Sequence, residues 1–175
     1  MTGFVNRIIR AAKLDVSLYE EVEADKTAMR QAMGVVVLSS VAAGIGAIAI
    51  RGPMAIVTGT IGALIGWYIW AFLTYWIGTK LLPEPQTKAN VGELLRTIGF
   101  SSSPGLVRVL GFVPVLGGII FFGASVWMLI AMVIAVRQAL DYKSTGRAIG
   151  VCLIGWLILL AVNFLFGLIT RHPSV

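Results

Sequence analysis

The chain has 175 residues, of which 58% are hydrophobic and only 13% are charged, with a formal net charge of +6. Soluble globular domains carry about a quarter charged residues, so this composition excludes an ordinary soluble protein. In a membrane protein basic residues mainly set orientation, and the positive charge therefore does not point to a nucleic-acid partner.

The first 14 residues, MTGFVNRIIRAAKL, alternate apolar and basic side chains at helical spacing. A helix here places Phe4 and Ile8 on one face and Arg7, Arg10 and Lys13 on the opposite face. A basic amphipathic helix of this kind rests on an anionic membrane surface, so we expect these three cations to contact interfacial lipid. A frayed terminus is the alternative interpretation.

The next stretch, DVSLYEEVEADKTAMRQA, completes a leader, residues 1–32, that precedes the membrane domain. Asp15 or Ser17 can cap a short helix in this stretch. The same stretch carries an acidic cluster formed by Glu20, Glu21, Glu23 and Asp25. We interpret this cluster as a solvated helix face, and a docking patch is the alternative.

Four long runs without Lys, Arg, Asp or Glu predict helices that cross a membrane. They are residues 31–50, 52–79, 109–136 and 148–170. Each run is about 20 residues or longer, which is the length needed to cross a hydrocarbon core about 30 Å thick. The runs are apolar on every side, so they lack the two-residue alternation of a transmembrane strand.

The third apolar region is too long for one crossing. About forty residues separate Arg96 from Arg137, and as one helix they would measure about 60 Å, twice the hydrocarbon core. The chain must therefore reverse, and the turn formers cluster around GFVP, residues 111–114. Asn90 can cap the span before this hairpin, and the serines before Pro104 can satisfy backbone groups that the proline frees.

These signals predict an all-α polytopic membrane protein. The expected architecture is a bundle of five transmembrane helices with an N-terminal interfacial amphipathic helix. The transmembrane domain covers residues 33–170, with spans at about 31–50, 54–79, 93–111, 115–138 and 146–170.

The distribution of basic residues predicts the orientation. With five spans and a cytoplasmic N-terminus, eleven of the 14 Lys and Arg residues face the cytoplasm: Arg7, Arg10, Lys13, Lys26, Arg30, Lys80, Lys88, Arg96, Arg137, Lys143 and Arg147. Only Arg51 and Arg171 lie outside. Counting residues 93–138 as one span leaves nine inside, so five spans follow the positive-inside rule better. We expect a multi-pass protein of the cytoplasmic (inner) membrane whose C-terminus is outside.

Arg108 is the one basic residue that this assignment places within a span rather than on either side of the membrane. It lies in the outer third of the third span, from which its side chain can snorkel to the interface. The alternative is a charge that is paired inside the bundle with Asn163, a carbonyl group, a lipid headgroup or another subunit. Arg108 and Asn163 therefore form the candidate intramembrane polar site.

Small residues four positions apart allow membrane helices to approach closely. The candidate packing pairs are Ala42 and Gly46, Gly62 and Gly66, and Gly146 and Gly150. Packing within the chain is the first interpretation, and contact between identical chains is the alternative. Trp67, Tyr68 and Trp70 are too deep for an interfacial belt, so we expect them to pack, or to face lipid or a partner. A pigment or quinone pocket is a further alternative.

Apart from Glu93 at the very start of the third span, the predicted spans contain no Asp, Glu or His, so they offer no proton relay and no carboxylate metal site at membrane depth. The sequence also shows no motif for nucleophilic catalysis or phosphate binding. His172 follows the last span, and Cys152 is the single cysteine. We expect that the protein is not an enzyme and uses neither a cofactor nor a metal ion.

Two stretches, ELLRTIGFSSSPGLVRVLGFVPVLGG and WMLIAMVIAVRQALDYKSTGRAIGVCLIGW, resemble the Yip domain, the Ypt/Rab-interacting protein family, in its bacterial branch. The order of an oblique helix, a Ser-Pro break, a hairpin, an apolar span and a basic turn carries the resemblance. The leader stretch LDVSLYEEVEAD is also similar, so the likeness covers residues 14–170.

The resemblance implies five membrane helices, a cytoplasmic N-terminus and membrane association, with no catalytic residues. In eukaryotes the family acts in vesicle traffic with Rab GTPases and related family members. Of the Asp-Leu-Tyr-Gly-Pro motif of the eukaryotic leader, this sequence keeps only Leu18 and Tyr19.

Three functions fit these observations. The first is a non-enzymatic membrane scaffold or accessory subunit that packs in the lipid bilayer with other membrane protein subunits or with itself. Small-residue and aromatic helix faces would form its contacts. The alternatives are a transporter or channel for a small solute or ion, because interrupted helices often line sites, and a membrane-shaping or trafficking-type protein.

Overall fold

The structure, a computed structural model, describes residues 3–170 and the side chains of residues 3–165. Its long helices are α3 (Met29–Gly46), α5 (Met54–Trp76), α7 (Gly117–Ala139) and α8 (Thr145–Thr170). Its shorter elements are α1 (Phe4–Ala12), α2 (Val16–Ala24), the 3-10 turn η1 (Lys26–Ala28), α4 (Ile48–Arg51), the π-helix η2 (Ile77–Leu81), α6 (Val91–Phe100) and the 3-10 helix η3 (Ser103–Phe112). The described residues form no strand, which confirms the all-α fold class.

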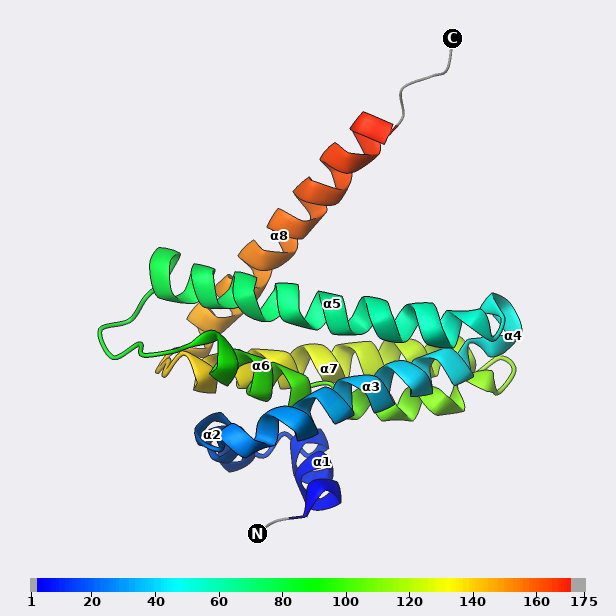
Figure 1. Cartoon of the computed structure of the whole chain (residues 1–175), viewed down its shortest axis with the longest axis horizontal. Helices are drawn as coiled ribbons and strands as arrows, with labels where there is room; N and C mark the ends of the chain where they lie inside the picture. The colour runs from blue at the N-terminus through cyan, green and yellow to red at the C-terminus, as the bar shows by residue number, and fades with distance from the viewer. Residues whose placement is uncertain (1–2, 171–175) are drawn as a thin grey trace.

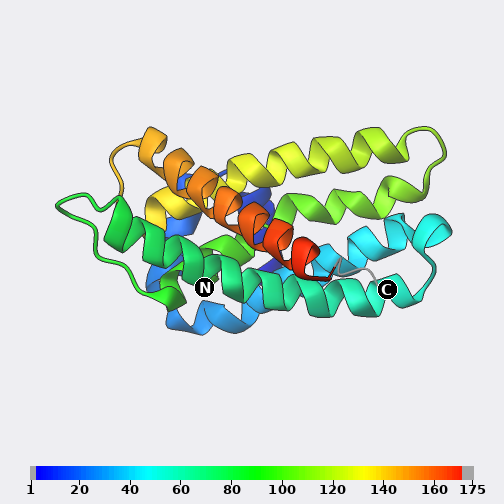
Figure 2. The ribbon, with the colours of Figure 1, turned by 90° about the horizontal axis from the view of Figure 1, so that it is seen from above.

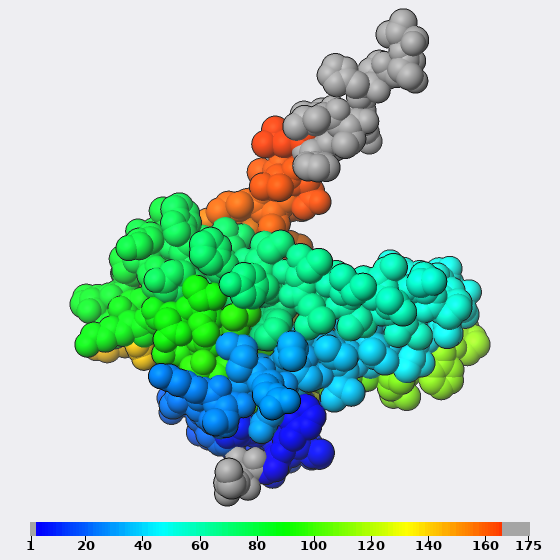
Figure 3. Space-filling model, in the orientation of Figure 1, coloured from blue at the N-terminus to red at the C-terminus, as the bar shows by residue number. Residues whose placement is uncertain are grey.

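The helices α3, α5 and α7 run along the bundle, whereas α8 leaves it at an angle (Figure 1). Seen from above, η3 and α7 lie on one side, α5 lies on the other, and α8 crosses obliquely over the space between them (Figure 2). The short helices α1 and α2 cover the opposite face of the bundle (Figure 1). In the space-filling view α8 stands clear of the body of the molecule (Figure 3). Much of its surface is therefore left without contacts from the rest of the chain.

Side-chain caps fix where the shorter helices begin. Asp15 accepts a hydrogen bond from the backbone N–H of Ser17 at 3.0 Å and caps α2. Asn90 caps α6 in a capping box, because its side chain accepts from the N–H of Glu93 while the Glu93 carboxylate accepts from the N–H of Asn90. Both residues were predicted to act as caps.

Four helical stretches are long and apolar enough to cross a membrane. They are Lys26–Gly46, Met54–Leu81, Gly117–Ala139 and Thr145–Leu165, and they correspond to the first, second, fourth and fifth predicted spans. The predicted third span, residues 93–111, is not among them, because the chain there forms two short helices, α6 and η3, instead of one.

The predicted reversal of the chain is present, two residues later than expected. The turn occupies residues 113–116, between the end of η3 and the start of α7, whereas the sequence placed it at 111–114. Val115 adopts a φ of 69° in this turn, a conformation that is unusual for a β-branched residue. The glycines and the proline therefore predicted the region of the turn. They did not predict that Val115 takes the left-handed conformation.

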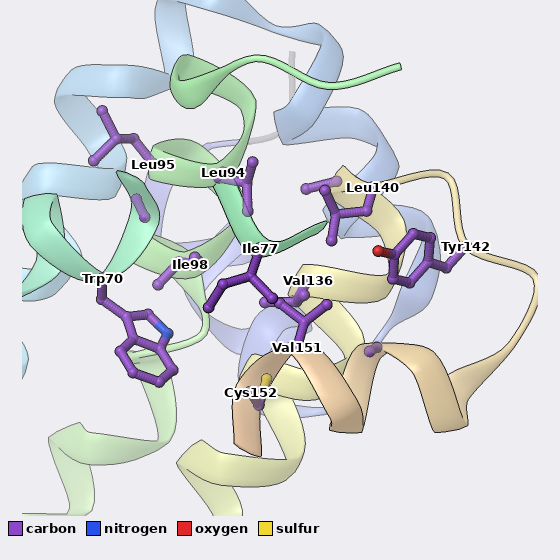
Figure 4. Packing of buried hydrophobic residues seen from close by; sticks show 13 residues of the cluster. Trp70, Ile77, Leu94, Leu95, Ile98, Val136, Leu140, Tyr142, Val151 and Cys152 are labelled. Carbon is purple, nitrogen blue, oxygen red and sulfur yellow. The ribbon is translucent and has the colours of Figure 1, made fainter. Parts of the chain in front are cut away.

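The first core cluster lies where the end of α5 meets α6, α7 and the beginning of α8 (Figure 4). Its centre includes Ile77, Leu94 and Leu140, each fully buried. Tyr142 closes the same region, because its hydroxyl donates to the carbonyl oxygens of Gly78 at 2.9 Å and Leu82 at 2.6 Å. These contacts hold the turn between α7 and α8 against η2 and the start of the loop that leads to α6.

The second core cluster joins the leader to the bundle. Leu18, Tyr19 and Val22 of α2 are fully buried against Ala32 of α3 and Phe100 of α6. The leader is therefore packed onto the membrane helices. Leu18 and Tyr19, the remnant of the eukaryotic leader motif, are core residues and are not displayed on the surface.

Close approach of η3 to α3 depends on Gly46. A Cβ atom at this position would overlap the carbonyl oxygen of Arg108, which cannot move without shifting the η3 backbone. We expect Gly46→Ala to lower the stability by about 1–3 kcal/mol, as overpacking does. Thermal unfolding in detergent measures this, with Gly123→Ala as the control because a Cβ there meets nothing within 4 Å. Equal unfolding temperatures for the two variants would contradict the close contact.

Candidate functional site

The break before η3 is chemically satisfied within the chain. Pro104 has no N–H to donate to the carbonyl of Phe100, and the hydroxyl of Ser103 donates to that carbonyl at 2.7 Å instead. The hydroxyl of Ser101 donates to the carbonyl of Ile98, also at 2.7 Å. The prediction that these serines replace lost backbone hydrogen bonds is confirmed, so the break stands without a bound ligand.

Arg108 extends from η3 toward α7. Its Nη2 donates to the hydroxyl of Ser125 at 2.9 Å, and its guanidinium lies 5.8 Å from the ring centroid of Phe121. Ser125 in turn donates to the carbonyl of Phe121 at 2.7 Å. The Nε atom of Arg108 is buried and has no hydrogen-bond partner. The cation is thus held in place by one hydroxyl and one aromatic ring, without a carboxylate.

Arg108 and Asn163 line the same cavity, which has a volume of about 1090 Å³. Residues of α3, α5, η3, α7 and α8 form its wall, and α8 crosses over it (Figure 2). The amide of Asn163 donates to the carbonyl of Leu159 on its own helix at 2.8 Å, and no hydrogen bond joins Asn163 to Arg108 among the described residues. The two polar residues predicted as one site therefore share a cavity without pairing.

The aromatic residues of α5 divide between the interior and the surface. Trp67 is half-buried, and its Nε1 donates to the carbonyl of Leu95 at 3.0 Å. Trp70 is buried and points into the first core cluster (Figure 4), but its Nε1 has no hydrogen-bond partner. Tyr68 is 58% exposed. Of the three residues predicted as a partner or lipid face, Tyr68 alone lies on an outer surface.

The predicted packing pairs have different surroundings. Ala42 and Gly46 are buried, and Gly46 lies against the η3 backbone. In contrast, Gly62 and Gly66 are exposed, and a Cβ atom at either would meet nothing within 4 Å. In α8, a Cβ at Gly150 would lie 3.4 Å from Leu82, whereas at Gly146 it would meet only Ser144. The open pair on α5 is thus available to a neighbouring molecule.

The family model of the Yip1 domain matches residues 26–166, which is most of the chain. The chain belongs to the Yip1 domain family. No curated protein and no solved structure gives a significant match. The Yip1 domain begins at η1 and takes in both elements of the broken third segment, the cavity and the described part of α8. The helices α1 and α2 precede it.

Ion pairs hold the two helices of the leader together, and Arg7 Nη1 also donates to Gln31 of α3 at 3.0 Å. The side chain of Arg7 is only 9% exposed and lies 2.9 Å from Glu21 and 2.8 Å from Asp25. Arg10 lies 2.7 Å from Asp15 and 2.5 Å from Glu21. The interpretation of the acidic cluster as a solvated face is therefore wrong for Glu21 and Asp25, because α1 binds to it. Lys13 is exposed and remains the basic residue of α1 most open to a lipid contact.

These contacts change the acidity of two leader carboxyl groups. Hydrogen bonds from Ser17 and then Arg10 lower the pKa of Asp15 to about 2. Hydrogen bonds from Thr27 and then Arg7 lower the pKa of Asp25 to about 2. Both groups stabilise the folded leader above their unfolded pKa near 3.8, and this contribution is lost as the pH falls toward 2.

Arg96 connects the Yip1 domain to the end of α2, a role that sequence analysis missed. Its Nε donates to the carbonyl of Val22 at 2.8 Å, and its Nη2 donates to the carbonyl of Glu23. The last carbonyls of a helix have no partner within the helix, and a cation there also interacts favourably with the helix dipole. Arg96 lies within the buried run 94–100, and a cation inside so apolar a helix was the signal available in the sequence.

We expect Arg7→Ala to destabilise the protein by about 2 kcal/mol, because the substitution leaves partly buried carboxylates without their cation. Thermal unfolding of the detergent-purified chain measures the change. Lys13→Ala is the matched control on the same helix, and a surface change of this kind shifts stability by about 0.5 kcal/mol or less. A similar loss in both variants would show that the ion pairs of Arg7 contribute nothing specific.

Glu23 gives the leader a second pH dependence. Burial, and then repulsion from Asp141 and Glu93, raise its pKa to about 7 from 4.5. A raised carboxyl pKa means that the folded state favours the protonated form, so the associated stability is present below pH 4.5 and is lost as the pH rises through 7. We expect the unfolding temperature to fall between pH 5 and pH 8, and Glu23→Gln to flatten this dependence. Asp15 and Asp25 do not titrate in that range, so an unchanged slope in the variant would refute the assignment.

Proposed function

We propose that this Yip1-family chain is a non-enzymatic scaffold or accessory subunit of a bacterial cytoplasmic membrane, and that it binds other membrane protein subunits or a second copy of itself. The open edge of α5 at Gly62 and Gly66 is the observation that carries this proposal. Two glycines four residues apart allow a partner helix to come within backbone contact, and no side chain of this chain fills that space.

The surroundings of this edge support the same proposal. Only 11% of the most apolar window of α5 is buried within the chain, the lowest share of the four membrane-length stretches. The neighbouring α8 diverges from α5 and leaves Trp156 and Leu160 exposed (Figure 3). Lipid covers most of such a surface, but the glycine edge lies beside the angle between α5 and α8, where a partner helix can contact both.

The chemistry of the interior favours a role without catalysis. The described part of the cavity lining contains Arg108, Arg51, Asn163 and several serines, but no Asp, Glu, His or Cys. General acid–base catalysis depends mainly on such groups, and a serine needs a neighbouring general base before it acts as a nucleophile. No group of three or more metal-ligating side chains occurs among the described residues either.

We also propose that the Yip1 domain crosses the membrane five times. At 1.5 Å per residue α6 is about 15 Å long, and at about 2.0 Å per residue η3 adds about 20 Å. Together they match a hydrocarbon core about 30 Å thick. Because η3 is followed by a turn and then by α7, the broken segment runs back alongside two full-length helices. An odd number of crossings puts the two ends of the domain on opposite sides of the membrane.

Cysteine accessibility tests this topology in a Cys152→Ser background. With a cytoplasmic N-terminus, cysteines at Thr87 and Ser144 should be protected from a membrane-impermeant thiol reagent in intact cells. Cysteines at Met54 and Val113 should be labelled, because the positive-inside rule keeps the basic loops inside. Protection at Val113 together with labelling at Ser144 would show that residues 93–138 cross only once.

Substitution of Gly62 tests the scaffold proposal. A larger residue closes the edge to a partner helix, so Gly62→Ile should abolish co-purification of the partner in mild detergent. Val57→Met, on another part of the exposed surface of α5, is the control and should leave the complex intact. In the Cys152→Ser background, a Gly62→Cys disulfide between chains would identify the partner as a second copy. A monomer without a partner in several detergents would overturn the proposal.

A transporter or channel is the second candidate, because a broken helix beside a polar cavity is a common feature of transport sites. The packing weighs against it. Trp70 and Ile98 line the cavity and also belong to the first core cluster, where side chains of this chain pack against them. Absence of flux in liposomes would remove this candidate.

For a membrane-shaping role, the supporting feature is the exposure of Val5 (66%) and Ile9 (48%) on α1.

A further inference from the structure

Two residues that line the cavity each carry a buried polar atom without a partner. Among the described side chains that do not lie on the surface, Arg108 Nε and Trp70 Nε1 are the only buried nitrogen or oxygen atoms without a hydrogen bond. One lies on η3 and the other on α5, and both residues line the same cavity. Buried polar groups in native proteins almost always have partners, so two unsatisfied donors in one cavity point to an absent acceptor.

The missing group should carry negative charge. A guanidinium has five N–H donors, and the hydrogen bond to Ser125 is the one recorded for Arg108. Arg51 at the end of α4 lines the cavity as well, and no carboxylate lies in the lining. An anion with several acceptor oxygens would satisfy these cations, and arginine suits the oxygens of a phosphate group.

The remainder of the cavity is shaped for a hydrocarbon chain. Its wall follows α5 from Ala55 to Trp70, about 22 Å at 1.5 Å per residue, and the small residues Gly59, Ala63 and Gly66 keep that wall flat. One membrane leaflet contributes about half of the 30 Å hydrocarbon core, so the length suffices for an acyl chain. Because α8 diverges from α5, such a chain can enter from the side (Figure 1).

We propose that the cavity binds one anionic glycerophospholipid from the leaflet on the side of turn 113–116. The phosphate lies at Arg108, with Arg51 as the second cation, and an acyl chain runs along α5 toward Trp70. The indole N–H of Trp70 is then available to an ester oxygen of the lipid. Gly66 borders both this cavity and the proposed partner edge, but Gly62, Arg108 and Arg51 each belong to one of the two sites alone. Lipid binding can therefore be tested separately from the scaffold role.

Native mass spectrometry of the full-length chain in detergent tests the site with phosphatidylglycerol and phosphatidylcholine as probes. We expect one phosphatidylglycerol to remain bound at an activation energy that removes phosphatidylcholine. Arg108→Gln should reduce the bound fraction about tenfold. Arg30→Gln, an exposed cation outside the cavity, should leave it unchanged.

A second variant keeps the test decisive if Arg108→Gln does not fold. Gly59→Leu introduces a side chain where a Cβ meets nothing within 4 Å, so it fills the apolar part of the cavity and leaves both cations in place. It should also lose phosphatidylglycerol. Equal retention of both lipids, or unchanged binding in Gly59→Leu, would overturn the proposal. Thermal stabilisation of lipid-stripped protein by inorganic phosphate, undiminished in Gly59→Leu, would assign the site to a free anion and reject the lipid.

Discussion

Backbone polar groups at membrane depth must find their partners inside the protein, and this constraint governs the third segment of the bundle. Pro104 takes away one hydrogen bond, and Ser103 returns it to the carbonyl of Phe100. The 3-10 helix that follows has poorer hydrogen-bond geometry than an α-helix, so it needs enclosure by protein. The absence of a side chain at Gly46 and Gly105 supplies that enclosure, because α3 and α7 can then close on the η3 backbone.

The cavity is a consequence of this arrangement. Because η3 is drawn toward α3 and α7, Arg108 emerges on the inner side of the bundle, where it reaches Ser125. On the other side, α8 is fixed by the first core cluster near its beginning and diverges farther along (Figures 1 and 4). The space between α5, α7 and α8 is therefore left unfilled at the end of the bundle that holds Arg108. The break between α6 and η3 therefore shapes one wall of the cavity and also places Arg108 in that wall.

Much of this fold could be predicted from the sequence, because charge-free runs and turn formers are local signals. They located the long helices to within a few residues, together with the chain reversal and the caps at Asp15 and Asn90. The helix type of η3 could not be predicted, since a Ser-Pro run specifies a break but not the geometry after it. The ion pairs of Arg7 were also missed, because the partners of α1 lie on another helix. The sequence predicted that Arg108 and Asn163 belong to one polar site. It did not predict the cavity that both residues line.

Three arginines that are buried or half-buried show how surroundings decide what a cation does. Arg7 pairs with two carboxylates of the leader and so joins α1 to α2. Arg96 donates to two carbonyls at the end of α2 and so attaches the leader to the bundle. Arg108 has a hydroxyl and an aromatic ring, and one of its nitrogen atoms is buried without a partner. Electrostatic interactions are stronger where water is absent, so an incompletely paired cation is most costly at membrane depth. Arg7 and Arg96 are explained by the fold that they hold together. Among the described residues Arg108 has no carboxylate partner, so its surroundings match those of the other two arginines least.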